Sequence, residues 1–350
     1  MNIVFIANHC CIRVQKFAVP LINAGHKVHL ITYKIPARTA PLFESITLCA
    51  DVENLQEAVK SYSKIADIFH AHNEPSWFVS VVKETTNTPV ILDVHDTYLT
   101  RSTEEESQAE KEQGKSLARR TTDERTNFKL ADGLNFVTGY AKEAAYTEYN
   151  LNQPFAVIPS YVPWEWYSQE SLEWLGGLVY EGKVTIGEEL RKTSRVFNYC
   201  NYEELAKQAH AAGLDLHLYG MRTDEAYEKV YGDIAFTHIP TNGIEIIRRI
   251  TRHDWGLLGN IFPHPQWQKT STNKMFEYIA AGVPVVAMNA QWSEEFVTKH
   301  EIGIAVHSLE ELLENWSKHT EIRKTLIKKR RQFSMEEHID DILDLYESVL

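Results

Sequence analysis

Short apolar runs alternate with segments of helical spacing from the first residues of the chain. Ile3–Ala7 and Val28–Thr32 are compact apolar runs of the kind that forms buried parallel strands. Between them, Val14–Ala24 repeats apolar residues at helical spacing, and Gly25 predicts the helix stop. Pro20 falls inside this pattern and predicts a kink or a later helix start. The segment therefore predicts one β-α-β unit.

The same alternation continues to residue 159. The expected strands are Ala66–His70, Pro89–Val94, Gly133–Thr138 and Phe155–Pro159, and the expected helices are Ser76–Glu84 and Tyr140–Tyr149. Arg101–Arg125 is polar and dense in charge, which predicts either a solvated helix or a mobile excursion. Strands that alternate with helices indicate a parallel sheet covered by helices on both faces.

A second alternation starts after Pro159–Trp174, a segment rich in proline and tryptophan that reads as a linker. Its expected strands are Leu178–Tyr180, Leu214–Tyr219, Ile234–His238, Trp255–Leu258, Pro284–Met288 and Gly303–Val306. Its expected helices are Tyr202–Ala212, Gly243–Ile250, Thr272–Ala281, Ser293–Lys299, Leu309–Lys318 and Glu321–Phe333, followed by an amphipathic segment, Met335–Leu350. We expect an α/β protein with two doubly wound, Rossmann-like domains facing each other across a cleft. Ligands of such sheets bind at the carboxyl ends of the strands.

The length of 350 residues suits two domains. We place the first domain at residues 1–162, the linker at 163–174 and the second domain at 175–333. Residues 334–350 are expected to form a helix that packs back on the first domain.

Net charge and apolar composition limit the classes of binding partner that we expect. The net charge of −12 disfavours a general affinity for nucleic acid. A local basic run, 323–331, predicts either a solvated helix face or a surface that rests on anionic lipid. The N-terminus lacks the features of a signal peptide, and no apolar stretch is long enough to span a bilayer. We expect a cytoplasmic protein, with weak contact to the inner membrane face as an alternative.

The four cysteines, Cys10, Cys11, Cys49 and Cys200, show no metal-type spacing and are expected to be reduced thiols. Cys10 or Cys11 is either a nucleophile or a small residue in a turn that follows a strand.

The densest chemical signal begins at Ser271. Ser271, Thr272 and Asn273 all suit the N-cap of the helix that follows. A helix N-terminus carries unpaired N–H groups and a partial positive charge, and therefore binds phosphate. Lys274 lies in the first turn, where its charge opposes the helix dipole, and a diphosphate would explain a cation at that position. One turn on, the Glu277 carboxylate can accept hydrogen bonds from both hydroxyls of a ribose.

This segment resembles the donor-binding motif of retaining GT-B glycosyltransferases, in particular those of glycosyltransferase family 4. In that family, a glutamate followed by small residues and Gly-x-Pro-Val binds the nucleotide ribose, and Glu277, Gly282, Pro284 and Val285 match this pattern. The resemblance implies that the amides around Thr272 and Asn273 face the diphosphate and the sugar. It also implies a UDP- or GDP-sugar donor, with no metal and no cofactor.

One position departs from the family pattern. Many members carry a second acidic residue eight positions before the ribose glutamate, and here that position is Lys269. The variant Asn273–Tyr278 also occurs among bacterial surface-polysaccharide transferases. The departure leaves the donor sugar open.

The resemblance assigns further residues. Lys183, after the first strand of the second half, takes the place of a family cation that meets the diphosphate; alternatively it is a solvated side chain. The place of the second family cation holds an acidic residue, and Arg191 or Arg195 is the candidate substitute. Ile239 and Pro240 form either an apolar wall for the base or an ordinary loop.

In the first half, His95 follows an apolar strand, and the family often has a histidine there that approaches the donor sugar. His70 and His72 end the preceding strand. Three histidines at neighbouring strand ends suggest metal, but no further ligand completes a set with clear spacing, and we expect no metal. Arg13 lies in a turn without the GxGxxG fingerprint and is a candidate contact for an anionic acceptor or for the donor phosphate.

The sequence thus predicts a retaining glycosyltransferase that moves a sugar from a nucleotide-sugar donor to an acceptor hydroxyl. The expected acceptor is a glycan or a lipid-linked sugar, in glycan or surface-polysaccharide synthesis. Three alternatives stay open: a nucleotide-sugar epimerase, a DNA-base glucosyltransferase, or a non-catalytic nucleotide-sugar binder.

Overall fold

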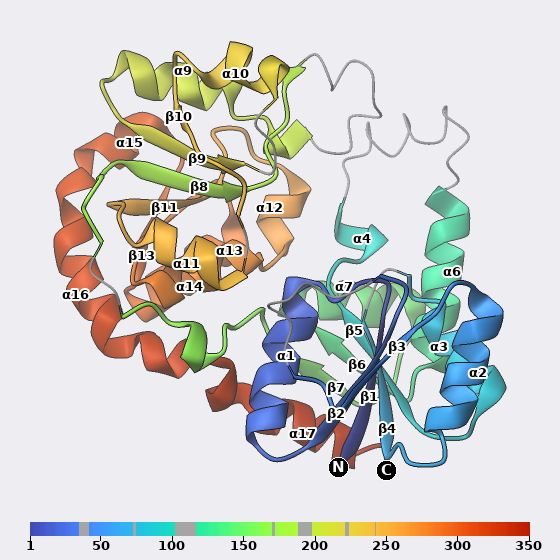
Figure 1. The fold of residues 1–350 in the computed structure, drawn as a ribbon. Helices are drawn as coiled ribbons and strands as arrows, with labels where there is room; N and C mark the ends of the chain where they lie inside the picture. The colour runs from blue at the N-terminus through green and yellow to red at the C-terminus, as the bar shows by residue number, and fades with distance from the viewer. Residues whose placement is uncertain are drawn as a thin grey trace. The chain divides into compact units, whose positions relative to one another are not determined.

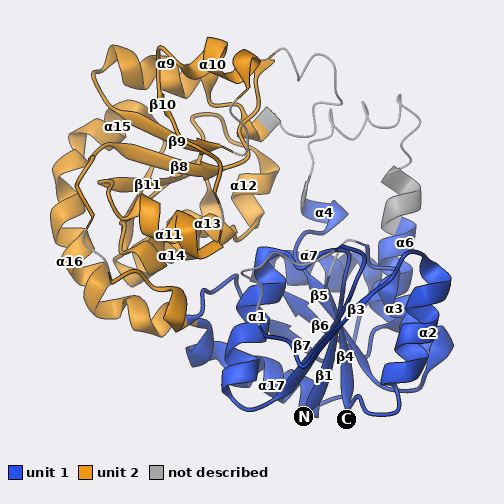
Figure 2. Cartoon of the chain, in the orientation of Figure 1, with its two compact units in different colours: residues 1–101, 116–163, 335–350 blue, residues 102–115, 164–334 orange. Residues whose placement is uncertain are grey.

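The computed structural model describes residues 1–34, 42–72, 75–101, 117–169, 172–187, 198–220, 224–241 and 243–350. The chain divides into two compact units (Figure 2). Unit 1 holds Met1–Arg101, Ser116–Pro163 and Met335–Leu350, and unit 2 holds Trp164–Ser334.

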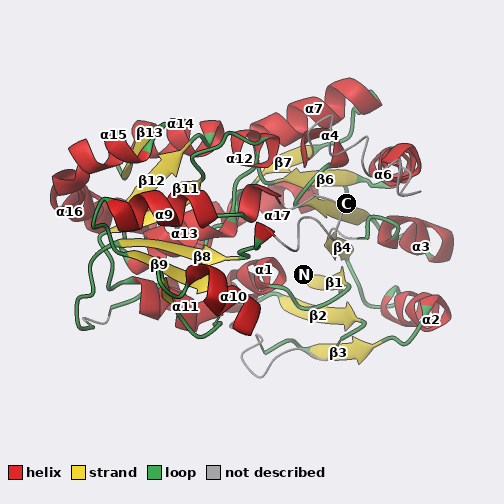
Figure 3. Ribbon diagram, turned by 90° about the horizontal axis from the view of Figure 1, so that it is seen from above, coloured by secondary structure: helices red, strands yellow, loops and turns green. Residues whose placement is uncertain are grey.

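Unit 1 is built on a parallel sheet of seven strands in the order β3-β2-β1-β4-β5-β6-β7 (Figure 1). The strands are β1 Asn2–Ala7, β2 Lys27–Thr32, β3 Ser45–Leu48, β4 Ile68–His72, β5 Val90–Val94, β6 Gly133–Phe136 and β7 Phe155–Val157. The helices are α1 Ile12–Asn23, α2 Val52–Tyr62, α3 Phe78–Thr85, α4 Tyr98–Arg101, α6 Leu117–Leu130, α7 Gly139–Tyr149 and α17 Ile339–Glu347. Viewed from above, helices cover both faces of the sheet (Figure 3).

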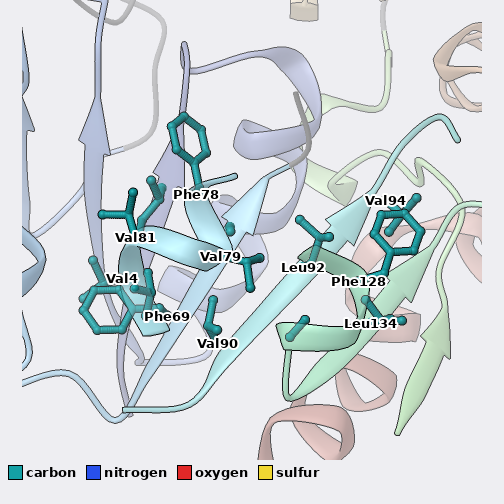
Figure 4. Close-up of a cluster of buried hydrophobic side chains, with 14 of the residues drawn as sticks. Val4, Phe69, Phe78, Val79, Val81, Val90, Leu92, Val94, Phe128 and Leu134 are labelled. Atoms are coloured by element: carbon teal, nitrogen blue, oxygen red, sulfur yellow. The ribbon is translucent and has the colours of Figure 1, made fainter. Parts of the chain in front are cut away.

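Alternation along the strands decides which side chains enter the main core of unit 1. Val4 of β1, Phe69 of β4 and Leu92 of β5 belong to one buried cluster, and α3 adds Phe78 and Val79 to it (Figure 4). The residues between them point to the opposite face, where α1 and α17 lie. Phe17 of α1 and Tyr346 of α17 both pack there against His70 of β4.

Three elements of unit 1 escaped the sequence prediction: the strand β3, the helix α2 and the short helix α4. The edge strand β3 has side chains that alternate between half-buried and exposed, so it lacks the continuous apolar run that marked the other strands. The following helix, α2, buries only Leu55, Ala58 and Val59. The later helix start that Pro20 suggested does not occur, because α1 begins at Ile12 and runs through this proline to Asn23.

Unit 2 has a parallel sheet of six strands in the order β10-β9-β8-β11-β12-β13. The strands are β8 Leu178–Gly182, β9 Leu216–Gly220, β10 Phe236–Thr237, β11 Trp255–Gly259, β12 Val285–Met288 and β13 Gly303–Val306. The helices are α9 Glu203–Ala211, α10 Glu225–Tyr231, α11 Gly243–Ile250, α12 Pro265–Lys269, α13 Asn273–Ala281, α14 Gln291–His300, α15 Leu309–Glu314 and α16 His319–Lys329. The short helices α10 and α12 were not predicted.

After α16 the chain supplies its last helix, α17, to unit 1. Tyr346 of α17 is fully buried, and a hydrogen bond of 2.6 Å joins its hydroxyl to Nδ1 of His70. Leu345 packs near Gly133 of β6, where an added Cβ would approach its Cδ1 to 3.1 Å. The predicted segment 334–350 is therefore a structural part of unit 1.

Candidate functional site

The first turn of α13 lies at the carboxyl end of the unit 2 sheet. Gly182 closes β8 with φ of +115°, and a Cβ built on it would lie 2.6 Å from Cε of Lys274. Thr272 occupies the N-cap position of α13, but its side chain makes no capping hydrogen bond. The start of the helix therefore presents backbone N–H groups and a partial positive charge at the strand ends. Gly282, with φ of 72°, ends the helix as predicted.

Two hydroxyls at this helix start lack partners. Ser271 Oγ and Thr272 Oγ1 are buried, and neither makes a hydrogen bond to any residue that the structure describes. A buried polar group without a partner costs about 1–3 kcal/mol. Such groups are rare in native structures and are expected where a bound molecule supplies the missing partner.

Two lysines lie close to the same point. Nζ of Lys274 lies 5.6 Å from the ring centre of Tyr180 and 5.9 Å from that of Trp267. Lys183 follows Gly182 directly and is exposed. Burial raises the pKa of the Cys200 thiol to about 11, against the opposing effect of both Lys274 and Lys183. Since both cations act on one thiol, they share a small region beside the start of α13.

Tyr278 anchors α13 against the sheet. Its hydroxyl donates to the carbonyl oxygens of Leu257 (3.2 Å) and Val179 (3.3 Å), and accepts from the amide of Glu181 (3.2 Å). Its ring covers Gly256 of β11, where a Cβ would lie 2.5 Å from the ring. This close approach sets the distance between helix and sheet, and with it the position of the helix start.

The other candidates for donor binding lie around this point in different environments. Glu277, in the second turn of α13, is buried, with 4% of its surface exposed. Asn273 and Thr272 are half-buried. Ile239 follows β10 and is 72% exposed, an unusual environment for a large apolar side chain.

The remaining basic residues predicted near the donor site are Arg191, Arg195 and Lys269. Arg191 and Arg195 lie outside the residues that the structure describes. Lys269 is exposed in the last turn of α12, at the position where the family pattern has an acidic residue. Among the cations predicted to contact the diphosphate, the structure therefore describes Lys183 and Lys274, which lie close to each other at the end of β8.

A second polar cluster lies in unit 1, on the sheet face covered by α1 and α17. Arg13 donates from Nε to Oδ2 of Asp93 and from Nη2 to Oδ1, both at 2.8 Å. It also donates to Ser160 Oγ and to the carbonyl of Ile158, each at 3.0 Å. The guanidinium is 2% exposed. These contacts leave it no open face, so Arg13 does not offer the contact to an acceptor or a phosphate that the sequence suggested.

Asp93 is the centre of this cluster. Asn135 donates to its Oδ1 at 2.6 Å, and Nε2 of His95 lies 2.7 Å from its Oδ2. Burial alone would raise the pKa of Asp93, but Arg13, His95 and His72 together hold it well below its ordinary value. The group is therefore a carboxylate, which only accepts hydrogen bonds. Nε2 of His95 must be the donor in this pair.

The same face brings His70 and His72 beside Asp93. One ligand atom from each of the three residues lies within 4.8 Å of the others, a spacing at which a metal is conceivable. Arg13, Asn135 and His95, however, already occupy the four lone-pair directions of the carboxylate. A dication would also lie beside the buried guanidinium. The residues fit a hydrogen-bonded ion pair better than a metal centre.

Cys10 and Cys11 follow β1 in unit 1. Burial raises the pKa of Cys10 to about 12 and also raises that of Cys11. A protonated thiol is a poor nucleophile, so the structure favours the interpretation of these residues as small residues in a turn.

The basic run of α16 serves mainly to hold unit 2 together. Arg323 donates to the carbonyls of Thr251 and His253, and Arg330 donates to those of Ser168 and Ala280. Lys324 and Lys329 pair with glutamates. Ile327 and Lys328 of the same helix are exposed, and contact with anionic lipid stays a prediction. Among the described helices, none combines the length and apolar composition needed to cross a bilayer.

Sequence reasoning missed Asp93, Tyr278 and Gly256. Asp93 lies inside an apolar strand, so its charge was itself a signal, because a carboxylate in a buried strand needs a cation as partner. Tyr278 was recognised as the last residue of the motif Asn273–Tyr278, but its anchoring role was not predicted.

Comparison with known proteins supplies an independent line of evidence. Residues 198–336 match the model of the glucosyltransferase 3-like C-terminal domain. No curated protein matches the sequence. Among solved structures, sucrose-phosphate synthase from Thermosynechococcus elongatus is 16% identical, with a TM-score of 0.75 over 100% of this chain and 99% of its own.

Two other solved structures are also similar along their whole length. HepE from Anabaena, solved in complex with UDP-glucose, is 12% identical, with a TM-score of 0.65 over 98% of this chain and 99% of its own. WaaG, a glycosyltransferase of lipopolysaccharide biosynthesis, is 16% identical, with a TM-score of 0.60 over 99% and 97%.

These matches confirm the predicted α/β class and its two Rossmann-like sheets as the GT-B fold. With a glucosyltransferase 3-like C-terminal domain over residues 198–336, the chain is a glycosyltransferase of the GT-B fold.

Proposed function

We propose that this protein is a retaining glycosyltransferase that moves a sugar from a UDP- or GDP-sugar to an acceptor hydroxyl, in the synthesis of a glycan or surface polysaccharide. The observation that carries the proposal is the start of α13. There, the N-terminus of a helix, two buried hydroxyls without a described partner and two lysines meet at one strand end. A diphosphate has the charge and the acceptor oxygens that this set of donors lacks.

Each donor group has a role in this proposal. Lys183 and Lys274 neutralise the diphosphate, and the amides of Thr272 and Asn273 donate to its oxygens. Glu277 accepts from the ribose hydroxyls, and exposed Ile239 packs against the base. His95, at the end of β5 in unit 1, is the proposed contact to the transferred sugar.

The proposed chemistry follows from charge. Glycosyl transfer passes through an oxocarbenium-like state while negative charge grows on the departing diphosphate. Fixed cations and oriented amides stabilise that charge without needing to reorganise. Arg191, which lies outside the described residues, is a further candidate for the same role. Retention of configuration requires that the acceptor hydroxyl attack the face from which the diphosphate departs.

A donor panel tests the proposal. Full-length protein is incubated with UDP-glucose and, separately, with GDP-mannose, and release of the nucleoside diphosphate is measured with and without simple sugar acceptors. We expect release from one donor, with the α-anomer transferred, and a loss of about tenfold or more in Lys274→Met. Binding without release would favour a non-catalytic binder, and neither binding nor release would overturn the proposal.

A further inference from the structure

The contact between His95 and Asp93 has a consequence for the imidazole ring. The two residues are two positions apart in and just after β5, so their side chains leave the same face of the sheet. In register, Asp93 pairs with His72 of β4 and with Asn135 of β6, which places its carboxylate in the middle of the polar face. Arg13 and Asn135 hold the carboxylate from the interior. The carboxylate is thus a fixed acceptor for Nε2 of His95.

A fixed acceptor selects a tautomer. A carboxylate accepts hydrogen bonds only, so Nε2 of His95 carries its proton in the pair. In the neutral imidazole, the lone pair then lies on Nδ1. Among the described residues, no hydrogen bond reaches Nδ1, and the His95 side chain is 23% exposed. Nδ1 is therefore the ring nitrogen that a substrate can reach.

We propose that Asp93 is the positioning residue of His95, and that it fixes the imidazole with Nε2–H toward the interior and Nδ1 toward a hydroxyl of the sugar substrate. The inference rests on the proposed role of His95 as a contact to the transferred sugar. It assigns to Nδ1 the acceptor role in that contact, so that the sugar hydroxyl donates. Asp93 acts through His95 and does not touch the sugar.

The two remaining histidines of the face show why Asp93 serves His95. Burial lowers the pKa of both His70 and His72. His70 has its own partner in the Tyr346 hydroxyl, at 2.6 Å. His72 lies 3.3 Å from Oδ2 of Asp93 and is 1% exposed, so it has no access to a substrate. Of the three imidazoles around the cluster, His95 alone is partly exposed.

The tautomer is measured directly. In full-length protein labelled with 15N-histidine, long-range 1H–15N correlation spectra at pH 9 show which nitrogen of a neutral imidazole carries the proton. The His95 signals are identified by their absence in His95→Gln. We expect the Nε2–H tautomer in the wild type, and a loss of this preference in Asp93→Asn. A wild-type Nδ1–H tautomer, or an unchanged tautomer in Asp93→Asn, would overturn the proposal.

Kinetics separate positioning from simple stabilisation. We expect Asp93→Asn to lower kcat by about 10- to 100-fold, with KM for the donor within about twofold of wild type. Asp93→Glu, which keeps the carboxylate, should restore part of the loss. The control is Tyr346→Phe, which removes another buried hydrogen bond from the same face and should keep wild-type kcat. Equal losses in Asp93→Asn and Tyr346→Phe would contradict a positioning role.

Failure of the proposed function and failure of the Asp93 proposal give different results. If the wild type transfers no sugar, the proposed function fails, while the tautomer still decides whether Asp93 positions His95. If Asp93→Asn does not fold, the wild-type tautomer alone carries the test, and Nδ1–H would overturn the proposal.

Discussion

The carboxyl ends of the two sheets use polar residues in opposite ways. In unit 1, the ion pair of Arg13 and Asp93 is closed on itself, and its guanidinium is 2% exposed. In unit 2, Ser271 and Thr272 hold buried hydroxyls without partners in the described structure, beside two lysines. The Arg13–Asp93 ion pair is thus saturated with hydrogen bonds, although His72 and Asn135 beside it keep buried polar atoms without a described partner. At the start of α13, by contrast, the unsatisfied hydroxyls lie beside two cations.

This difference teaches how to rank candidate sites. The sequence marked both Arg13 and Lys274 as candidate anion contacts, Arg13 in a turn that follows a strand and Lys274 in the first turn of a helix. The structure separates them, because the donors of Arg13 are satisfied inside the fold, and those around Lys274 are not. Saturation of hydrogen bonds, more than residue type, indicates where a ligand binds.

The largest effect is expected from breaking the closed cluster. Arg13→Met leaves Asp93 as an unpaired buried charge, which costs about 3–5 kcal/mol. Urea denaturation measures the loss. The matched change in unit 2, Lys183→Met, removes an exposed cation and should alter stability by less than about 0.5 kcal/mol while weakening nucleotide binding. Equal stability losses in both variants would remove the contrast between the clusters.

Acid should destabilise the protein through buried histidines. In unit 2, burial and neighbouring positive charges lower the pKa of His217 to about 3 and those of His238 and His253 to about 4. The unfolded chain binds protons on these groups near pH 6.5, but the folded chain does not. Stability is therefore complete above about pH 6.5 and falls as the pH drops toward 4.

Urea unfolding at pH 7, 6, 5 and 4 measures this slope. His217→Phe removes one of the three titrating groups and should flatten it. The low pKa of Asp93 acts in the same direction at lower pH. Its contribution to stability is complete above the ordinary pKa of the unfolded carboxyl and is lost as the pH falls from there through the depressed folded pKa. A slope that is the same in His217→Phe and wild type would show that this cluster does not cause the acid sensitivity.

Gly256 tests the anchoring of α13. Gly256→Ala places a Cβ 2.5 Å from the Tyr278 ring, and overpacking of this kind costs about 1–3 kcal/mol. Because α13 must shift, nucleotide affinity should fall as well. Gly139→Ala is the control, since its Cβ would meet nothing within 4 Å. Thermal denaturation of both variants measures the difference, and equal melting temperatures would contradict the steric argument.

The smallest expected effect is a gain in stability at the open cluster. Ser271→Ala removes a buried hydroxyl that lacks a described partner, so the free protein should become more stable by about 1 kcal/mol. Nucleotide affinity should fall at the same time. Ser334→Ala removes another such hydroxyl, away from α13, and should stabilise without changing affinity. If Ser271→Ala bound nucleotide as tightly as wild type, the hydroxyl would not belong to the site.

The sequence predicted those parts of the fold that rest on local patterns. Buried strands such as β1 and β12 are continuous apolar runs, and α13 has an N-cap at Thr272 and a glycine stop at Gly282. The edge strand β3 was missed, because it is only half-buried and carries a weaker pattern. The other edge strands, β7, β10 and β13, were predicted, so it is the weak apolar pattern of β3 that explains this miss.

The candidate site shows the same limit over longer distances. Arg13 and Asp93 lie 80 residues apart, and no local pattern relates them. The proximity of Lys274 to Gly182 likewise depends on how α13 packs on β8, and Tyr278 fixes this packing through contacts to β8 and β11. Residue types were predictable, but their partners depended on the tertiary structure.

Calorimetric titration with UDP and GDP tests the central claim most directly, because it asks whether the open cluster of unit 2 binds a nucleoside diphosphate. Wild type and the double variant Lys183→Met/Lys274→Met are titrated side by side. We expect one of the two nucleotides to bind wild type, and the double variant, still folded, to bind it about 100-fold more weakly, since each lysine contributes about 1.4 kcal/mol. Equal affinity in the two proteins, or no binding to folded wild type, would contradict the account.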